Sequence, residues 1–200
     1  PLMPGAGHMV HMPSHIYMRV GRYEDAFEVN RRASDADSQY IAQCNAQGIY
    51  PLNYYPHNLH FMVWAAMFQG RQEAALAGAR EVESKIPVDM EGNAFAAFET
   101  FLSQPLYVMV RFGLWDKILD EPKPVKGNRF QLGVWHYARG MALANSGKLR
   151  QAEKEAGALS GVRKSLPDDY FIGFGTAPKL LNIAELVLRS DLAVKRGDMD

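Results

Sequence analysis

The chain has 200 residues, 48% hydrophobic and 22% charged, and its 22 Lys and Arg residues are matched by 22 Asp and Glu. This size and composition allow a sizeable core and exclude wholesale disorder. With neutral histidines the net charge is zero. A chain without net charge has no overall positive potential to attract a nucleic-acid backbone or an anionic membrane, so neither is expected as a partner.

The single cysteine, Cys44, excludes a disulfide framework and a cysteine-based zinc site, and it favours a reducing compartment such as the cytoplasm. No apolar run reaches the roughly 18 to 20 residues that a membrane span needs. The sequence opens without an initiator Met and closes on a charged segment, so both ends are expected to be cut from a longer protein.

Apolar residues recur at intervals of three and four along most of the sequence, and this spacing predicts helices. Pro105 is expected to kink one helix, and Pro122 and Pro124 are expected to shorten the next. Helices that alternate with short turns indicate an all-α protein built of αα-hairpins. The predicted helices cover 8–20, 23–39, 57–69, 71–85, 92–112, 129–146, 148–164 and 178–196, and the longest loops cover 40–56 and 165–177.

Several predicted helices end at a glycine that is followed, two positions on, by a bulky residue. Glycine takes a positive φ without a Cβ clash, so a tight turn between antiparallel helices is expected at each. These glycines recur at irregular intervals and are Gly21, Gly70, Gly113, Gly147 and Gly197.

This pattern resembles the tetratricopeptide repeat, a helix–turn–helix unit, and Tyr17, Ala33, Pro87, Gly140 and Leu143 occupy further matching positions. The segment HMVHMPSHIYMRVGRY over 8–23 is also similar to one in a group of bacterial tetratricopeptide proteins, which implies a bacterial origin. The resemblance implies an α-solenoid of antiparallel helical hairpins with irregular repeats, forming a single domain over 1–200. Its units fall near 7–39, 56–87, 99–121 and 133–166, with a truncated unit at 183–200.

Five of the six histidines form two groups: His8, His11 and His15, then His57 and His60. On a helix each group lies within about 60° of arc, so each forms a stripe on one face. The resemblance implies that both stripes line the concave face of neighbouring repeats. Neutral imidazoles bind zinc or copper, and pairs spaced by three or four chelate from one helix.

About 10.5 Å of helix axis separates His8 from His15, too far to share one ion. The preferred metal set is therefore His8, His11, His57 and His60, with His15 in place of His8 if the helices slip by one turn. The sequence does not decide between zinc and copper as the bound metal. Methionine thioethers bind Cu(I), but methionine is also a common core residue in helical packing. The nearby methionines are Met3, Met9, Met12, Met18, Met62 and Met67.

The resemblance implies a scaffold that binds a peptide, protein or small ligand on its concave face. The expected groove residues are Tyr17, Met18, Arg19, Trp64, Met67, Tyr54 and Tyr55, of which the last two belong to an aromatic loop that either covers the groove or packs against the body. The alternative is a metal-binding protein or metalloenzyme with the ion at His8, His11, His15, His57 and His60. No complete catalytic motif is present, so the sequence leaves enzymatic activity, the partner and the oligomeric state open. His136 is expected to be a core packing residue.

Overall fold

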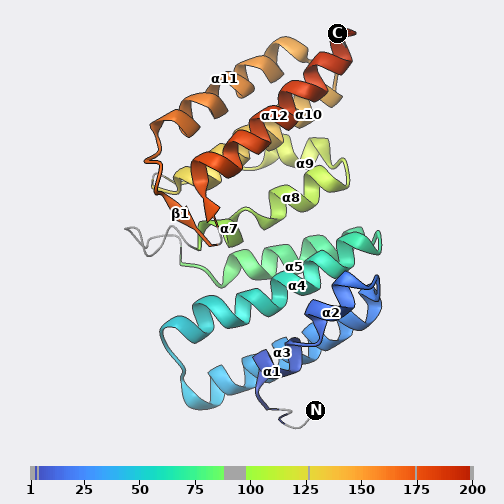
Figure 1. Cartoon of the computed structure of the whole chain (residues 1–200), viewed down its shortest axis with the longest axis vertical. Helices are drawn as coiled ribbons and strands as arrows, with labels where there is room; N and C mark the ends of the chain where they lie inside the picture. The colour runs from blue at the N-terminus through green and yellow to red at the C-terminus, as the bar shows by residue number, and fades with distance from the viewer. Residues whose placement is uncertain (1–2, 4, 88–97, 126, 174, 199–200) are drawn as a thin grey trace. The chain divides into compact units, whose positions relative to one another are not determined.

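A computed structural model describes residues 3, 5–87, 98–125, 127–173 and 175–198 (Figure 1). These residues are predominantly helical, which confirms the predicted all-α class. Their contacts divide the chain into two compact units, Pro1–Pro87 and Val88–Asp200. Within the described ranges, no helix combines the length and the apolar character needed to cross a membrane.

The first unit contains five α-helices and one π-helical turn over its described residues. Their bounds are α1 (Gly7–His11), α2 (Ser14–Arg19), α3 (Tyr23–Cys44), η1 (Tyr50–Tyr54), α4 (Tyr55–Phe68) and α5 (Gln72–Ser84). The single helix predicted over 8–20 is wrong, because the chain breaks between α1 and α2 at Met12 and Pro13. Proline has no N–H to continue the helix, and its ring clashes with the preceding turn. The loop predicted over 40–56 is also mostly helical: it contains the end of α3, the η1 turn and the start of α4.

One face of α3 carries small and polar residues where a core helix usually carries large apolar ones. Ala26, Asn30, Ala33 and Asp37 recur at intervals of three and four, and all four are fully buried. This helix contacts α1, α2 and α4. The alanines let these neighbours approach closely, and the two polar side chains must then find hydrogen-bond partners inside the unit.

All five glycines adopt the positive φ predicted for a tight turn, and the first four lie between two helices of the described residues. Gly21, Gly70, Gly113, Gly147 and Gly197 have φ between 65° and 83°. After each, a backbone N–H bonds a carbonyl five residues earlier, as in a Schellman motif: Arg22 to Tyr17, Arg71 to Ala66, Leu114 to Met109, Lys148 to Leu143, and Asp198 to Ala193. The helices on either side contact each other at the first four turns, in the pairs α2·α3, α4·α5, α8·α9 and α10·α11.

The second unit contains α7 (Glu99–Leu102), α8 (Gln104–Arg111), α9 (Trp115–Asp120), α10 (Arg129–Asn145), α11 (Leu149–Ser165) and α12 (Ala177–Arg196). Residues 92–97 of the helix predicted over 92–112 lie outside the described residues. The rest of it breaks at Ser103, with Pro105 in the first turn of α8, and α9 ends before Pro122, as expected. A two-residue strand pair, β1 (Phe171–Ile172) and β2 (Gly175–Thr176), lies in the predicted loop over 165–177.

Helix α10 is central to the second unit and packs on both α11 and α12 (Figure 1). Gly133 and Gly140 face the side chains of Leu181 and Leu188 on α12, and a Cβ at either glycine would overlap those leucines. The two glycines therefore set the close approach of α10 and α12.

Candidate metal centre

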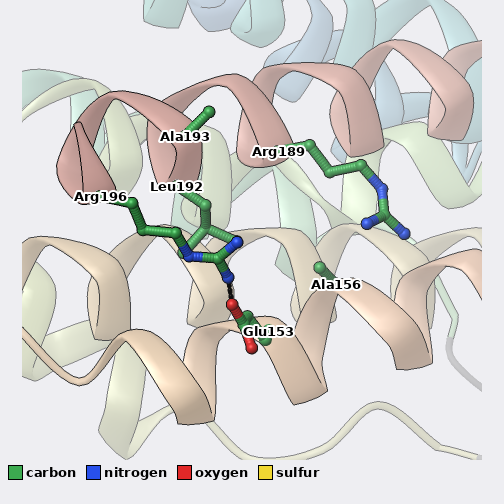
Figure 2. A pocket seen from close by; sticks show the side chains of 6 residues that line it. All are labelled: Glu153, Ala156, Arg189, Leu192, Ala193 and Arg196. Atoms are coloured by element: carbon green, nitrogen blue, oxygen red, sulfur yellow. Dashed lines mark ion pairs between the residues drawn. The ribbon is translucent and has the colours of Figure 1, made fainter. Parts of the chain in front are cut away.

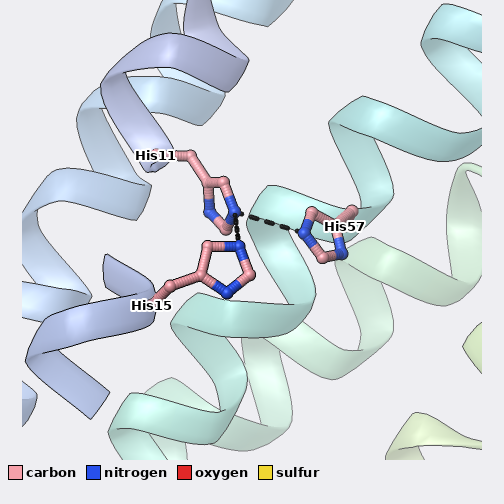
Figure 3. A group of neighbouring side chains, drawn as sticks. All are labelled: His11, His15 and His57. Atoms are coloured by element: carbon pink, nitrogen blue, oxygen red, sulfur yellow. Dashed lines mark hydrogen bonds between the residues drawn. The ribbon is translucent and has the colours of Figure 1, made fainter. Parts of the chain in front are cut away.

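Three histidines of the first unit converge on one point (Figure 3). His11 Nε2 lies 3.0 Å from His15 Nε2 and 3.2 Å from His57 Nε2. One nitrogen from each ring lies within 4.8 Å of the other two. Among the residues that the structure describes, no other group of three or more His, Cys, Asp or Glu side chains approaches this closely.

The three rings come from three different helices. His11 ends α1, His15 lies in the first turn of α2, and His57 lies in the first turn of α4. The break at Pro13 does not separate the first two, because the four-residue spacing still brings their rings to a centroid distance of 4.8 Å. Phe61, one turn after His57, packs edge-on against all three rings at centroid distances of 4.6 to 4.9 Å. One side of the histidine group is therefore apolar.

The orientation of the His11 ring is fixed by Asn30 of α3. Its Nδ1 lies 2.7 Å from Asn30 Oδ1, and Ser14 Oγ lies 3.2 Å from the same nitrogen. The Asn30 amide nitrogen donates to the Ala26 carbonyl at 2.7 Å, so the amide oxygen is the atom that faces His11. An oxygen acceptor there places the His11 proton on Nδ1 and leaves the Nε2 lone pair directed at the other two rings.

The surroundings keep the three imidazoles neutral. Burial, together with the neighbouring imidazoles, lowers the pKa of His11 to about 4 and that of His57 to about 4. Burial also lowers the pKa of His15. Neutral rings retain the lone pairs that a metal ion requires.

His8 and His60 lie outside this group of three, which corrects the preferred set of His8, His11, His57 and His60. His8 stacks on His11 at a centroid distance of 5.3 Å, and its buried Nδ1 has no hydrogen-bond partner. His60 instead packs against Trp64 at 4.5 Å. The one-turn slip considered from the sequence, with His15 replacing His8, describes the observed group better.

The expected groove residues differ widely in exposure. Tyr54 and Trp64 are 36% and 39% exposed, and Arg19 is exposed, whereas Tyr17, Met18 and Met67 are half-buried. Tyr55 is buried within α4 and its hydroxyl donates to Glu81, so it is not part of a covering loop. Tyr54 meets the His8 ring edge-on at 4.8 Å and lies beside the histidine group.

Sequence reasoning missed Asn30, Asp37 and Phe61. A signal for the first two was available, since both share a helical face with Ala26 and Ala33, and a polar residue between buried alanines needs an internal partner. No comparable signal marks Phe61, because an apolar residue in a core helix is ordinary.

His136 of the second unit is half-buried and not enclosed as a packing residue. Its Nδ1 lies 2.6 Å from Glu155 Oε2, and Arg139 donates to the other oxygen of that carboxylate at 3.2 Å. These contacts link α10 to α11, so His136 has a structural role that requires no ligand.

A pocket of about 320 Å³ lies between α11 and α12 (Figure 2). Arg196 pairs with Glu153 and Arg189 pairs with Glu185, so each guanidinium group at this pocket already has a carboxylate partner. The pocket is lined by Glu153, Ala156, Arg189, Leu192, Ala193 and Arg196. It is a weaker candidate site than the three histidines.

Comparisons of the chain with protein-family models, curated proteins and solved structures found no match. The resemblance to the tetratricopeptide repeat accordingly stays a prediction.

Proposed function

We propose that this chain binds a transition-metal ion, with zinc as the first candidate, through Nε2 of His11, His15 and His57. The main support for this proposal is that three neutral imidazole rings each place a nitrogen within 4.8 Å of the other two. In tetrahedral zinc sites the Zn–N distance of about 2.0–2.1 Å separates two ligand nitrogens by about 3.3 Å. The distances from His11 Nε2, 3.0 and 3.2 Å, are close to this spacing.

The hydrogen bond from His11 Nδ1 to Asn30 gives further support. Metal-bound histidines commonly donate their second ring N–H to an oxygen acceptor, which fixes the tautomer and the ring orientation. Binding an ion would require only that His15 and His57 carry their protons on Nδ1. The low pKa values of His11 and His57 mean that both rings are already neutral at neutral pH, so binding an ion releases no proton from them.

An all-imidazole ligand set favours zinc, copper, nickel or iron over calcium or magnesium. Three histidines with an open fourth position are typical of catalytic zinc, whereas a fourth protein ligand is typical of structural zinc. His8 is the candidate for that fourth ligand, because its ring stacks on His11 and its buried Nδ1 has no partner. The metalloenzyme alternative therefore depends on whether His8 or water completes the set.

Elemental analysis of untagged protein, before and after incubation with Zn²⁺, tests the proposal. We expect about one zinc per chain in the wild type and loss of that zinc in His57→Ala. His136→Ala is the matched control, because that histidine bonds Glu155 outside the group. Retention of zinc by His57→Ala, or no uptake by the wild type, would contradict the proposal. Weaker binding by His8→Ala would indicate a closed four-histidine site.

We further propose that the metal centre is carried by a tetratricopeptide-like solenoid whose first repeats bind a peptide, protein or small ligand. The repeated glycine turns support the scaffold. Large apolar side chains exposed on α1, α2 and α4, or directly after α1 and α2, support a contact surface; they are Met9, Met12, Ile16, Val20, Trp64 and Phe68. Binding of such a partner should persist after chelator treatment and should be lost in Trp64→Ala. Loss of binding on chelation would instead show that the metal takes part in recognition.

A further inference from the structure

We infer that Asp37 is a positioning residue: its buried carboxylate ties the helix that carries His11 to the helix that carries His57, and thereby sets the spacing of the ligands. The inference rests on the metal-binding function proposed above. It concerns a residue of α3 that contributes no ligand itself.

Hydrogen bonds from three segments converge on the Asp37 carboxylate, which is fully buried. Tyr50 donates its hydroxyl to Oδ1 at 2.7 Å, and Asn58 donates its amide N–H to Oδ2 at 2.6 Å. The backbone N–H of Gly7 also donates to the carboxylate. Such charge-assisted bonds offset the cost of removing a carboxylate from water, and they fix the donors in place.

Two of these donors belong to the elements that carry the ligands. Gly7 is the first residue of α1, one helical turn before His11. Asn58 directly follows His57 on α4. One carboxylate therefore holds both α1 and α4, and the distance of 3.2 Å between His11 Nε2 and His57 Nε2 depends on their relative placement.

The contact between Gly7 and Asp37 is unusually close. A Cβ at Gly7 would overlap the Asp37 carboxylate and would lie 2.6 Å from the Ala33 carbonyl oxygen. Only glycine therefore allows α1 to lie this close to α3. The same face of α3 carries Asn30, so one helix supplies both the residue that orients the His11 ring and the residue that spaces the helices.

The second unit contains a buried carboxylate that serves as a control for a purely structural role of Asp37. Glu99 is also a fully buried carboxylate, and it accepts hydrogen bonds from the Tyr170 hydroxyl at 2.5 Å and from the backbone N–H of Phe130 at 2.7 Å. The chemistry is the same, but the unit does not contain His11, His15 or His57. Glu99→Gln is thus the control for Asp37→Asn.

The experiment measures Zn²⁺ affinity by competition with a chromophoric chelator and records the visible spectrum of bound Co²⁺. Asp37→Asn replaces one acceptor oxygen with a donor and loosens the link between α1 and α4. Removing a group that bonds a metal ligand directly typically weakens binding about 10- to 100-fold, so the effect of Asp37, which acts through the helices, has this range as its upper limit. We expect a measurable loss of affinity, up to about 100-fold, together with an altered Co²⁺ spectrum. Glu99→Gln should lower the melting temperature while leaving the affinity and the spectrum unchanged.

Two further variants test the path of the effect. Asn58→Ala removes the link to α4 and should weaken Zn²⁺ binding in the same direction, and combining it with Asp37→Asn should add little, because Asn58 acts through Asp37. Tyr50→Phe removes one of the three bonds and keeps the carboxylate. It replaces Asp37→Asn if that variant does not fold, with a smaller expected loss of affinity.

Histidine ring ¹⁵N shifts of the metal-free protein provide a readout that does not depend on metal. Asp37→Asn should change the shifts of His11 and His57, and Glu99→Gln should not. A folded Asp37→Asn protein with wild-type affinity, Co²⁺ spectrum and ring shifts would overturn the inference. Failure of the proposed function looks different: the wild type would bind neither Zn²⁺ nor Co²⁺, and the ring shifts alone would then decide whether Asp37 positions the histidines.

Discussion

The amide oxygen of Asn30 lies 2.7 Å from Nδ1 of His11, and both side chains are fully buried. Because the amide nitrogen of Asn30 is engaged with the Ala26 carbonyl, the amide cannot turn over without losing a bond. The pair therefore selects one tautomer of His11 and directs its free lone pair toward His15 and His57. A polar residue in the middle of a long helix thus determines the chemistry of a ring on another helix.

Replacing Asn30 with leucine should weaken both folding and metal binding. The buried His11 Nδ1–H would lose its nearer acceptor and keep only Ser14 Oγ at 3.2 Å. This costs about 1–3 kcal/mol of unfolding free energy, and metal affinity should fall about 10- to 100-fold. Urea denaturation and chelator competition measure the two effects. Ser34→Ala is the control on the same helix: its buried hydroxyl has no hydrogen-bond partner, so the change should be nearly neutral. Equal behaviour of the two variants would show that Asn30 does not orient the ring.

The metal-free protein should lose stability as the pH falls from about 6.5 to about 4. His11 and His57 have folded pKa values of about 4, below the value of 6.5 in the unfolded chain, so the unfolded state binds protons first. Their contribution is fully present above pH 6.5, and each loses at most about 1.4 kcal/mol per pH unit across this window. Urea midpoints between pH 4 and 8 measure the effect. His57→Ala should flatten the dependence, and an unchanged slope in that variant would contradict the assignment.

Zinc should raise the stability of the first unit, and a chelator should remove the gain. At a free zinc concentration 100 times its Kd, binding to the folded state adds about 2.7 kcal/mol. Thermal unfolding with and without Zn²⁺ measures this gain. His15→Ala should respond weakly, whereas Glu99→Gln should retain the full response, because its carboxylate bonds Tyr170 and α10. A full response in His15→Ala would remove that residue from the ligand set.

Two glycines of the second unit should respond in opposite directions to alanine. At Gly140 of α10 a Cβ would overlap Leu188, so Gly140→Ala should destabilise the fold by about 1–3 kcal/mol through overpacking. At Gly157 of α11 a Cβ would meet nothing within 4 Å. Gly157→Ala should therefore stabilise the helix by up to about 1 kcal/mol. Chemical denaturation separates the two, and a neutral Gly140→Ala would show that α12 can move away from α10 without cost.

Much of the local structure is encoded in short stretches of the sequence. The five turn glycines adopt the positive φ that their positions predict. Pro105 lies in the first turn of α8, and α9 ends two residues before Pro122. These features depend only on the backbone preferences of single residues. The boundaries that were wrong also have a local cause. Pro13 divides the first helix, and the region 40–56 contains helical segments that its tyrosines and prolines did not indicate.

The sequence by itself determined that His11 and His15 lie together, because their four-residue spacing brings the two rings to one side of the chain even though Pro13 interrupts the helix between them. Only the tertiary structure decided that His57 joins them and that His8 and His60 do not. His57 and His11 are 46 residues apart, and their contact depends on how closely α1 and α4 pack around α3. That approach is set by the alanines, by Gly7 and by the Asp37 carboxylate, whose roles appear only once the helices are placed against one another.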